Sequence, residues 1–427
     1  MTKLIESCAL AVLAFLAAAG LRAADGPNKT SQGEQDADWP CWRGPRGDAR
    51  PTIRGITTDF SKGLEKLWEV KDLCQGENSQ SWSAPSIQGE RLVVSGRHGD
   101  DDVIFCLNAD TGKPLWRKSY PAPGKIDRGS GPRATPCIDG DRVYTFGCMG
   151  HLACWGLADG KRLWMRQVEE EGGRRPEWGH ASSPLIYQDK VIVQGGGTAL
   201  VAAFEKMTGK LAWKSMTGQA AYAAPVLAAV AGKPQLIVFP AAGPAGLDPR
   251  TGRKLWTFPH TTPYDMNCAT PILVGETLFI ASAVEKNRGG CRLLKLSAAE
   301  PEQLWHSQKL GDYHSDPVIL DGYIYCFSGW PQGNSGALKC LRLADGEVMW
   351  SVRGMGCGSL LYVDGRLMMM NNRGRLALLR PNPKGLEKLT EFQAIAGHPV
   401  WTTPVIARGK LYVRFTNHLI CYRLKDR

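Results

Sequence analysis

Several motifs that would point directly to a chemistry are missing from this sequence. It contains no two adjacent cysteines, no Cys-x-x-Cys-His for an attached haem and no His-Glu-x-x-His of zinc proteases. The Gly-x-x-x-x-Gly-Lys-Ser/Thr phosphate loop and the Gly-x-Ser-x-Gly nucleophile turn are missing as well. The 8 histidines show no tight metal-ligand spacing. The sequence therefore predicts no metal site, and it argues against zinc proteases, P-loop nucleotide hydrolases and serine hydrolases that carry these motifs.

Long apolar runs are also scarce. The run at residues 8–20 follows a basic residue at position 3 and is too short to cross a bilayer. Small residues follow it, with cleavage expected after one of the alanines at 19, 23 and 24, so residues 1–24 read as a signal peptide; the alternative is an uncleaved anchor. Cys8 precedes the apolar run and is therefore a poor lipid-attachment site. We expect a periplasmic or secreted protein with no transmembrane span after cleavage.

Basic residues outnumber acidic ones, 52 to 41, which gives a formal net charge of +11. The excess is scattered and forms no long Lys/Arg block, so we interpret it as solvated surface. No recognised nucleic-acid-binding motif accompanies the charge, and we expect no nucleic-acid partner.

The 13 cysteines suggest disulfides in an exported protein. Four of them occupy the same place in the repeat described next: Cys106, Cys154, Cys340 and Cys421. Equivalent positions lie in different repeats, so these four are expected to be small core fillers. Bridges among the others, such as Cys41 with Cys74, are left open.

One unit recurs along the chain: a small residue and a proline, two apolar strands around a Gly turn, a third strand, a turn like Thr-Gly-Lys, and Leu-Trp. Its tryptophan returns at seven positions, Trp68, Trp116, Trp164, Trp213, Trp256, Trp305 and Trp350, and Phe392 is interpreted as the eighth member. Its proline returns at Pro85, Pro136, Pro184, Pro225, Pro271, Pro317 and Pro404, and Ser359 is interpreted as filling the missing place. Both series give eight units at spacings of about 40–50 residues, close to the period of a four-stranded propeller blade.

The recurring residues suit such a blade. A proline at the first residue of an innermost strand needs no ladder N–H, and the tryptophan of the outer strand can bury its ring between blades while its N–H reaches a backbone acceptor. Residues 64–70 supply an outer strand before any inner strand, and residues 401–424 supply three strands and then stop. We therefore predict an all-β fold, an eight-bladed β-propeller of four-stranded antiparallel blades, closed by an N-terminal outer strand that completes the C-terminal blade. The propeller covers residues 64–424, between a linker at 25–63 and a tail at 425–427.

Residues 105–116, Phe-Cys-Leu-Asn-Ala-Asp-Thr-Gly-Lys-Pro-Leu-Trp, resemble the tryptophan-docking motif of propellers with pyrroloquinoline-quinone (PQQ) repeats. The resemblance covers residues 64–424. Residues 39–45, Trp-Pro-Cys-Trp-Arg-Gly-Pro, also resemble an N-terminal motif of secreted PQQ-like propellers from planctomycete-type bacteria. This family contains quinoprotein alcohol dehydrogenases and non-catalytic scaffolds of the BamB type, so the resemblance implies an architecture and leaves the function open.

The central funnel should be lined by residues just before the innermost strands, where alternate residues share a face. The residue directly before each proline is small or short. Two residues earlier stands a varied ring: Trp82, Arg133, Ala181, Tyr222, Cys268, His314, Gly356 and Trp401. Trp178 is expected above it. We predict a ligand- or partner-binding funnel formed by Trp82, Arg133, His180, Tyr222, Asn267, His314 and Trp401. The alternative is that these side chains fill the channel or bridge blades.

A quinoprotein enzyme would need a cation-held quinone and a carboxylate base in the same funnel. Asp265 or Asp316 are the candidates for the base, Asn267 for a metal oxygen and Arg133 for a partner of the quinone oxygens. The adjacent cysteines and the long insertions that the resemblance implies for those enzymes are absent. We therefore expect no cofactor and a non-catalytic binding or scaffold module that engages an envelope or extracellular protein, or a small ligand, at one mouth of the funnel. The alternative is a dehydrogenase that uses PQQ with calcium to oxidise an alcohol or sugar.

Overall fold

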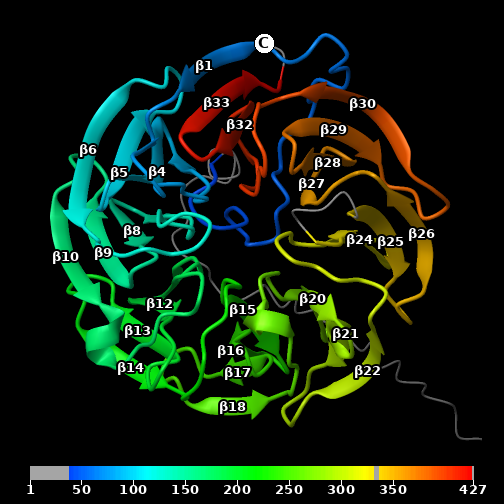
Figure 1. Cartoon of the computed structure of the whole chain (residues 1–427). Coiled ribbons are helices and arrows are strands. Elements are labelled where there is room, and N and C mark those ends of the chain that lie inside the picture. Colours follow the sequence, from blue (N-terminus) through cyan, green and yellow to red (C-terminus); the bar gives the residue numbers. More distant parts are fainter. Residues whose placement is uncertain (1–37, 331–335, 426–427) are drawn as a thin grey trace, which may run out of the picture.

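Eight antiparallel sheets form a ring around a central axis in the computed structural model, which describes residues 38–330 and 336–425 (Figure 1). Apart from two short 3-10 helices, η1 (Val168–Glu171) and η2 (Pro263–Asp265), the regular structure of these residues is β-strand. The predicted all-β, eight-bladed propeller is confirmed. The expected signal peptide lies outside the described residues. Within the described ranges, no helix has the length and apolar character needed to cross a membrane.

Each blade contributes four strands, numbered from the axis outward. Blade 1 contains β3 (Ser86–Gln88), β4 (Arg91–His98), β5 (Asp101–Asn108) and β6 (Pro114–Pro121), and blade 2 contains β7 (Cys137–Asp139), β8 (Arg142–Phe146), β9 (His151–Gly156) and β10 (Arg162–Gln167). Blade 3 contains β11 (Leu185–Tyr187), β12 (Lys190–Gln194), β13 (Val201–Glu205) and β14 (Leu211–Ser215), and blade 4 contains β15 (Val226–Val230), β16 (Lys233–Val238), β17 (Ala245–Leu247) and β18 (Lys254–Thr257). Blades 5 to 7 contain β19 (Ile272–Val274), β20 (Thr277–Glu285), β21 (Arg288–Lys295), β22 (Glu302–Ser307); β23 (Val318–Leu320), β24 (Tyr323–Ser328), β25 (Ala337–Arg342), β26 (Val348–Arg353); and β27 (Gly358–Val363), β28 (Arg366–Asn371), β29 (Arg375–Arg380), β30 (Glu387–Gln393).

Blade 8 is built from both ends of the described chain. Its inner strands are β31 (Val405–Ala407), β32 (Lys410–Phe415) and β33 (His418–Arg423), and its outer strand is β1 (Lys66–Val70), which pairs antiparallel with β33. This is the predicted closure of the ring. A short strand, β2 (Cys74–Gln75), then pairs in parallel with the end of β4 and leads into blade 1.

One register row runs through all eight blades. In blade 1 it joins Trp116, Cys106, Val93 and Ser86, and in blade 8 it joins Trp68, Cys421, Tyr412 and Val405. In both outer strands a β-bulge skips the residue next to the tryptophan, and in both blades the proline directly precedes the innermost residue of the row. The cysteines of the repeat therefore lie opposite the tryptophans, buried, as the sequence predicted for core fillers.

Blade 7 corrects two predictions. Its register row joins Thr390, Leu378, Met368 and Leu361, with the bulge directly beside Thr390. Thr390 thus occupies the tryptophan place, and Phe392 stands two residues further along the strand. The proline place falls on Leu360 instead of Ser359. The error arose because blade 7 lacks both marker residues, and spacing alone does not reveal where a bulge adds a residue.

Five of the seven repeat tryptophans pack their rings on a glycine of the next blade, namely Trp68, Trp116, Trp164, Trp213 and Trp305. A Cβ placed on Gly112 of blade 1 would lie 2.7 Å from the ring of Trp68, and one on Gly160 of blade 2 would lie 2.6 Å from Trp116. Both glycines have positive φ, so the turn needs glycine twice over, for its backbone and for the space that the ring takes. Five of the seven indole N–H groups donate to a backbone carbonyl of the next blade, namely those of Trp68, Trp116, Trp164, Trp305 and Trp350.

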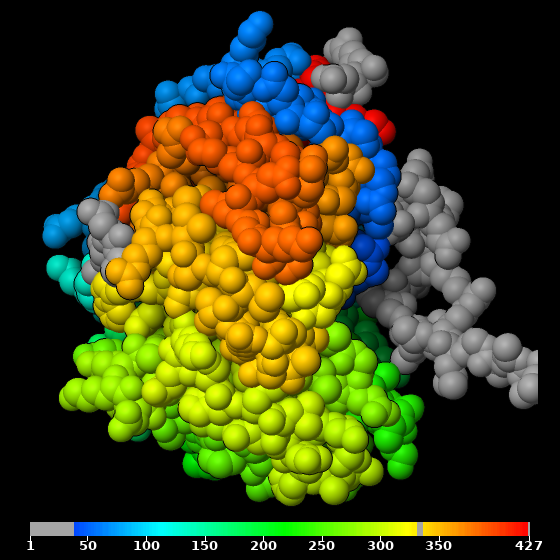
Figure 2. Space-filling view, turned by 90° about the vertical axis from the view of Figure 1, so that its right-hand side faces the viewer, coloured from blue at the N-terminus to red at the C-terminus, as the bar shows by residue number. Residues whose placement is uncertain are grey.

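The segment from Trp39 to Ile56, called the strap below, crosses the centre of the ring, as the blue trace in Figure 1 shows. In the side view of Figure 2 the blue residues gather along the right-hand edge, so the strap lies on one face of the disc. It is held by backbone contacts: Trp39 pairs with Ile87 of β3, and Pro40 accepts the N–H of Ile138 in β7 at 2.7 Å. At its far end Ile56 pairs with Lys425. The described part of the predicted linker is therefore packed on the ring.

We expect Trp116→Ala to lower the free energy of unfolding by about 3–5 kcal/mol, because it opens a cavity between blades 1 and 2 and removes the donor to the Leu157 carbonyl. The matched control is Leu115→Ala, the neighbouring residue in the same strand, whose side chain is 48% exposed; its cost should stay below about 1 kcal/mol. Urea unfolding followed by circular dichroism measures both, and equal costs would contradict the role given to the ring.

Candidate ligand-binding cavity on the propeller axis

A cavity of about 220 Å³ lies on the axis, where the segments that precede the innermost strands converge. Five of the predicted funnel residues line it: Trp82, Arg133, Tyr222, His314 and Trp401. The base candidate Asp316 lines it as well, together with Ala181 and Cys268 of the same predicted ring. Seven of the eight ring positions are thus brought together. Only blade 7 is displaced, because the shift of its proline place moves the equivalent position from Gly356 to Cys357, which lines a smaller neighbouring cavity of about 10 Å³.

Three aromatic rings form one wall of the cavity. The ring centroids of Trp82 and Trp401 are 4.7 Å apart, and those of His314 and Trp401 are 4.9 Å apart. The indole nitrogen of Trp401 is buried and finds no hydrogen-bond partner among the described residues. Enclosure in the funnel, with the Arg133 guanidinium adding to it, lowers the pKa of His314. The imidazole is therefore neutral at neutral pH, and this wall presents flat, uncharged faces.

A second aromatic group stands at blades 3 to 5. Trp178 lies 5.8 Å from Tyr222 and 6.3 Å from Tyr264, measured between ring centroids. Tyr264 is 57% exposed, and it and Asp265 both adopt positive φ, near 55°. Two successive non-glycine residues with such left-handed backbone angles are uncommon, and each of them stores conformational strain. The loop that carries Tyr264 thus holds an aromatic side chain out to solvent beside the cavity.

Arg133 carries a positive charge into the cavity. Its Nη1 donates to the carbonyls of Gly129 (2.8 Å) and Gly131 (3.2 Å) and to the sulfur of Cys148 (3.3 Å), and its Nη2 donates to the carbonyl of Asp127 (3.1 Å). All four acceptors are neutral groups. They orient the guanidinium without cancelling its charge.

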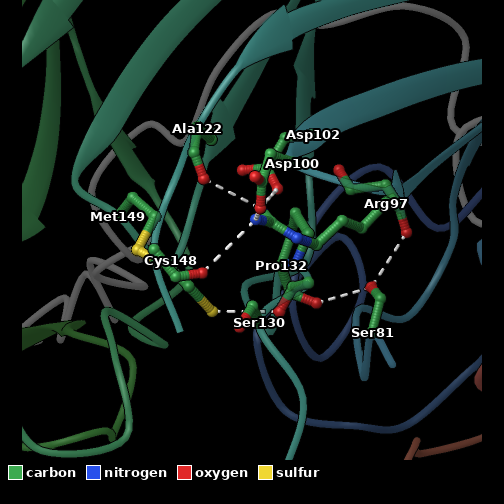
Figure 3. Close-up of polar contacts among 12 residues, drawn as sticks. Ser81, Arg97, Asp100, Asp102, Ala122, Ser130, Pro132, Cys148 and Met149 are labelled. Carbon is green, nitrogen blue, oxygen red and sulfur yellow. Dashed lines mark hydrogen bonds and ion pairs between the residues drawn. The ribbon is translucent and has the colours of Figure 1, made fainter. Parts of the chain in front are cut away.

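A buried polar network holds the loop that carries Arg133 (Figure 3). Arg97 of β4, 1% exposed, donates from Nη1 to Oδ1 of Asp102 (3.0 Å) and to the carbonyl of Ala122 (3.0 Å), at the start of the loop. Near its end, Ser81 donates to the carbonyl of Pro132 at 2.6 Å. Burial raises the pKa of Asp102 to about 7, although Arg97 acts in the opposite direction. The position of Arg133 therefore depends on residues of β4 that never touch the cavity.

The strap supplies the end wall of the cavity. Trp42 lines it and donates its indole N–H to Oγ1 of Thr270 at 2.9 Å. Arg43, 7% exposed, donates to Oδ2 of Asp316 at 2.5 Å, while the backbone N–H of Thr270 donates to Oδ1 of Asp316 at 2.7 Å. Both carboxylate oxygens of Asp316 are thus occupied. This role of the strap was not predicted from the sequence. Its signal was the cluster of two tryptophans and an arginine ahead of the first blade.

His180, Asn267 and Asp265 do not belong to the cavity lining. His180 is 1% exposed and packs against Phe146, and burial lowers its pKa to about 3. Asn267 is fully buried; its side-chain Nδ2 donates to the carbonyl of Pro240, and its backbone carbonyl accepts the N–H of Tyr222. His180 and Asn267 fit the alternative stated for the funnel residues, core filling and bridging between blades. Burial raises the pKa of Asp265, which lies in η2.

A calcium-held quinone is a poor fit to these residues. The oxygens of Asp316 accept from Arg43 and Thr270, and Oδ1 of Asn267, the candidate metal oxygen, is buried outside the cavity lining. Over residues 38–330 and 336–425, no group of three or more His, Cys, Asp or Glu side chains is placed to hold a metal ion. The donor set that the enzymatic alternative requires is not assembled at this cavity.

Comparison with known proteins agrees with the fold. The family model described as "Outer membrane protein assembly factor BamB" matches residues 58–144 and 125–352. Among curated proteins, the chain is 22% identical over 358 residues to a BamB of Moranella endobia, covering 82% of this chain and 77% of that protein. It is 23% identical over 168 residues to a BamB of Burkholderia pseudomallei, covering 38% of this chain but only 41% of that protein.

Solved structures of two differently named proteins share the architecture. BamB from Moraxella catarrhalis superposes with a TM-score of 0.60 at 15% identity, covering 85% of this chain and 98% of that one. Quinohemoprotein alcohol dehydrogenase from Comamonas testosteroni superposes with a TM-score of 0.65 at 14% identity, covering 93% of this chain and 82% of that one. At these identities the likeness establishes the fold alone.

We expect Arg43→Ala to lower the free energy of unfolding by about 3–5 kcal/mol, because it leaves the Asp316 carboxylate buried without its cation. The matched control is Arg46→Ala in the same strap, whose ion pair with Asp48 is 45% and 37% exposed; its cost should be below about 1 kcal/mol. Urea unfolding tests the pair. If the two variants lose the same stability, the strap is not anchored through Arg43.

His180 should make the protein sensitive to acid. Its pKa of about 3 in the folded chain lies below the ordinary value near 6.5, so the unfolded state binds the extra proton as the pH falls from 6.5 towards 3. The stability that this histidine contributes is complete above pH 6.5, and about 2 kcal/mol of it should be lost at pH 5. His180→Phe should remove that part of the pH dependence, measured by urea unfolding at pH 7.5 and 5. A loss between pH 7.5 and 5 that stays at full size in His180→Phe would contradict the prediction.

Proposed function

Because this chain belongs to the family described as outer membrane protein assembly factor BamB, we propose that it is a non-catalytic binding propeller that holds a ligand, or a short segment of a partner protein, in its axial cavity. We place it in the periplasm or outside the cell. The apolar run at residues 8–20 and the family membership support that location.

The observation that carries this proposal is the composition of the cavity. Aromatic walls and a small number of oriented polar groups are typical of ligand sites, and tryptophan, tyrosine and arginine are typical of the centres of protein interfaces. Here Trp82, Trp401 and Tyr222 supply the apolar faces and Arg133 supplies a fixed positive charge. A channel that served only packing would have no need of a solvated guanidinium held by a buried network.

The same geometry leads us to propose that no PQQ is bound. A quinone cofactor would need a carboxylate free to hold a cation or accept a proton. Two carboxylates line the cavity: Asp316 accepts from Arg43 and Thr270 on its two oxygens, and both oxygens of Asp127 accept from its neighbour Arg128. Asp265 is outside the lining. We therefore assign Asp316 a structural role, in which it anchors Arg43 of the strap.

Site-specific photocrosslinking tests the binding site. A photoreactive phenylalanine analogue placed at Tyr264, beside the cavity and 57% exposed, should give discrete products when the chain is exported in its host cells. The same analogue at Met207, 55% exposed and in the turn between β13 and β14, is the matched control and should give none of them. Adding Arg133→Ala to the chain with the analogue at Tyr264 should reduce the yield of crosslinked products at least about tenfold, because the positive charge that holds the ligand or partner segment is removed.

The enzymatic alternative is tested on the same protein. With PQQ and calcium added, the purified chain should show neither stoichiometric binding nor dye-linked oxidation of alcohols or sugars. Stoichiometric binding with turnover would overturn the non-catalytic assignment. Products that form equally from Tyr264 and Met207, or that survive Arg133→Ala unchanged, would overturn the cavity as the binding site.

A further inference from the structure

Two cysteines meet where the strap crosses blade 2. Cys41 lies in the strap and is partly exposed, and Cys137 is the first residue of β7 and is 5% exposed. Cys41 packs against the core cluster that contains Cys137, and the Cys137 thiol lowers the pKa of Cys41. They are not bonded in the structure. We propose that Cys41 and Cys137 form a disulfide that ties the strap covalently to the ring.

The backbone sets the two residues opposite each other. The strap pairs antiparallel with β3 through Trp39 and Ile87, and it meets the equivalent strand of the next blade, β7, through the hydrogen bond from Ile138 N–H to the Pro40 carbonyl at 2.7 Å. One step further along each antiparallel chain, Cys41 faces Cys137. Opposed residues of antiparallel strands have Cα atoms about 4.5–5.5 Å apart, which is within the span of a disulfide. The contact therefore needs no rearrangement of either strand.

The position of Cys137 is also unlike that of the repeat cysteines. Cys106, Cys154, Cys340 and Cys421 lie opposite tryptophans in the middle of their blades. In the register row the place of Cys137 is held in blade 1 by Ser86 and in most other blades by aliphatic residues, and only blade 2 has the strap running past it with a thiol of its own. Among these eight equivalent places, Cys137 alone is a thiol that lies beside a thiol of the strap.

The bond would form by thiol–disulfide exchange with an external disulfide, either a protein dithiol oxidase or oxidised glutathione. Cys41 is the more exposed of the two, and the neighbouring Cys137 thiol lowers its pKa, which favours its thiolate. The Cys41 thiolate attacks one sulfur of the oxidant and expels the first oxidant thiolate. Cys137 then gives its proton to solvent, attacks the Cys41 sulfur and expels the second. The two protein thiols lose two electrons and two protons, and the oxidant disulfide becomes a dithiol.

The tie would matter for the cavity, because Trp42 and Arg43 follow Cys41 directly. With Cys41 fixed to β7, the strap cannot lift from blade 2, and the residues that form the end wall stay in place. The proposal needs an oxidising compartment, as the proposed exported location provides, but it does not depend on which ligand the cavity holds.

Peptide mapping tests the bond on the full chain. The reduced protein is folded, exposed to oxidised glutathione at neutral pH, blocked with N-ethylmaleimide and digested with trypsin without reduction. We expect a linked species that joins the peptide of Cys41 to the peptide of Cys137, lighter than their sum by two hydrogens and lost on reduction. Cleavage within the strap should be slowed at least about tenfold by oxidation, since local opening is then restricted.

Two variants control the mapping. Cys137→Ser should remove both the linked species and the effect of oxidation on strap cleavage, whereas Cys154→Ser, which removes a buried thiol of β9 in the same blade, should leave both unchanged. Cys41 joined only to glutathione, Cys41 joined to Cys74, or N-ethylmaleimide on both Cys41 and Cys137 after oxidation would overturn the proposal. Peptide mapping of the wild-type chain alone decides whether the disulfide forms, so the test remains valid even if a variant folds poorly.

Discussion

The ring depends on the packing between neighbouring blades, and at five of its eight interfaces an indole lies against a glycine of the next blade. Trp68 and Gly112 make this contact between blades 8 and 1, and Trp116 and Gly160 make it between blades 1 and 2, with no room for a Cβ at either glycine. The closing interface thus uses the same contact as an ordinary one, although its outer strand comes from the other end of the chain. Because no blade buries its own faces alone, the ring forms only when every blade packs on both of its neighbours.

The side chains that surround the axis come from the segments that lead into the innermost strand of each blade. These segments bring Trp82, Arg133, Tyr222, His314 and Trp401 from five different blades to one cavity. Their placement is not left to the loops alone, since Arg97 and Asp102 fix the loop of Arg133 from within blade 1. The strap adds the remaining wall and joins blades that are not neighbours in the ring. The architecture and the site are therefore linked through residues with no direct part in binding.

Much of this fold was predictable because the residues that recur in each blade are types with strong structural preferences. Tryptophan and proline mark seven blades, and a Thr-Gly turn marks three of these as well, so the residue types predict both the blade number and the closure. Blade 7 lacks these markers, so Phe392 and Ser359 were assigned by spacing, and a bulge next to Thr390 made both assignments wrong. The strap's contacts could not be predicted, because a segment that occurs once has no period and pairs with residues hundreds of positions away, as Arg43 does with Asp316.

The cavity was predictable only in part for the same reason. Alternation before each innermost strand brought the ring residues together, but the burial of His180 and Asn267 depends on neighbours from other blades. The most direct test is an experimental structure of the full chain bound to the ligand or partner segment that is recovered with it from its host cells. We expect the ligand between Trp401 and Tyr222, in contact with Arg133 and with its far end against Trp42. A ligand bound along the outer strands, or one that displaces the strap to pass through the channel, would contradict this placement.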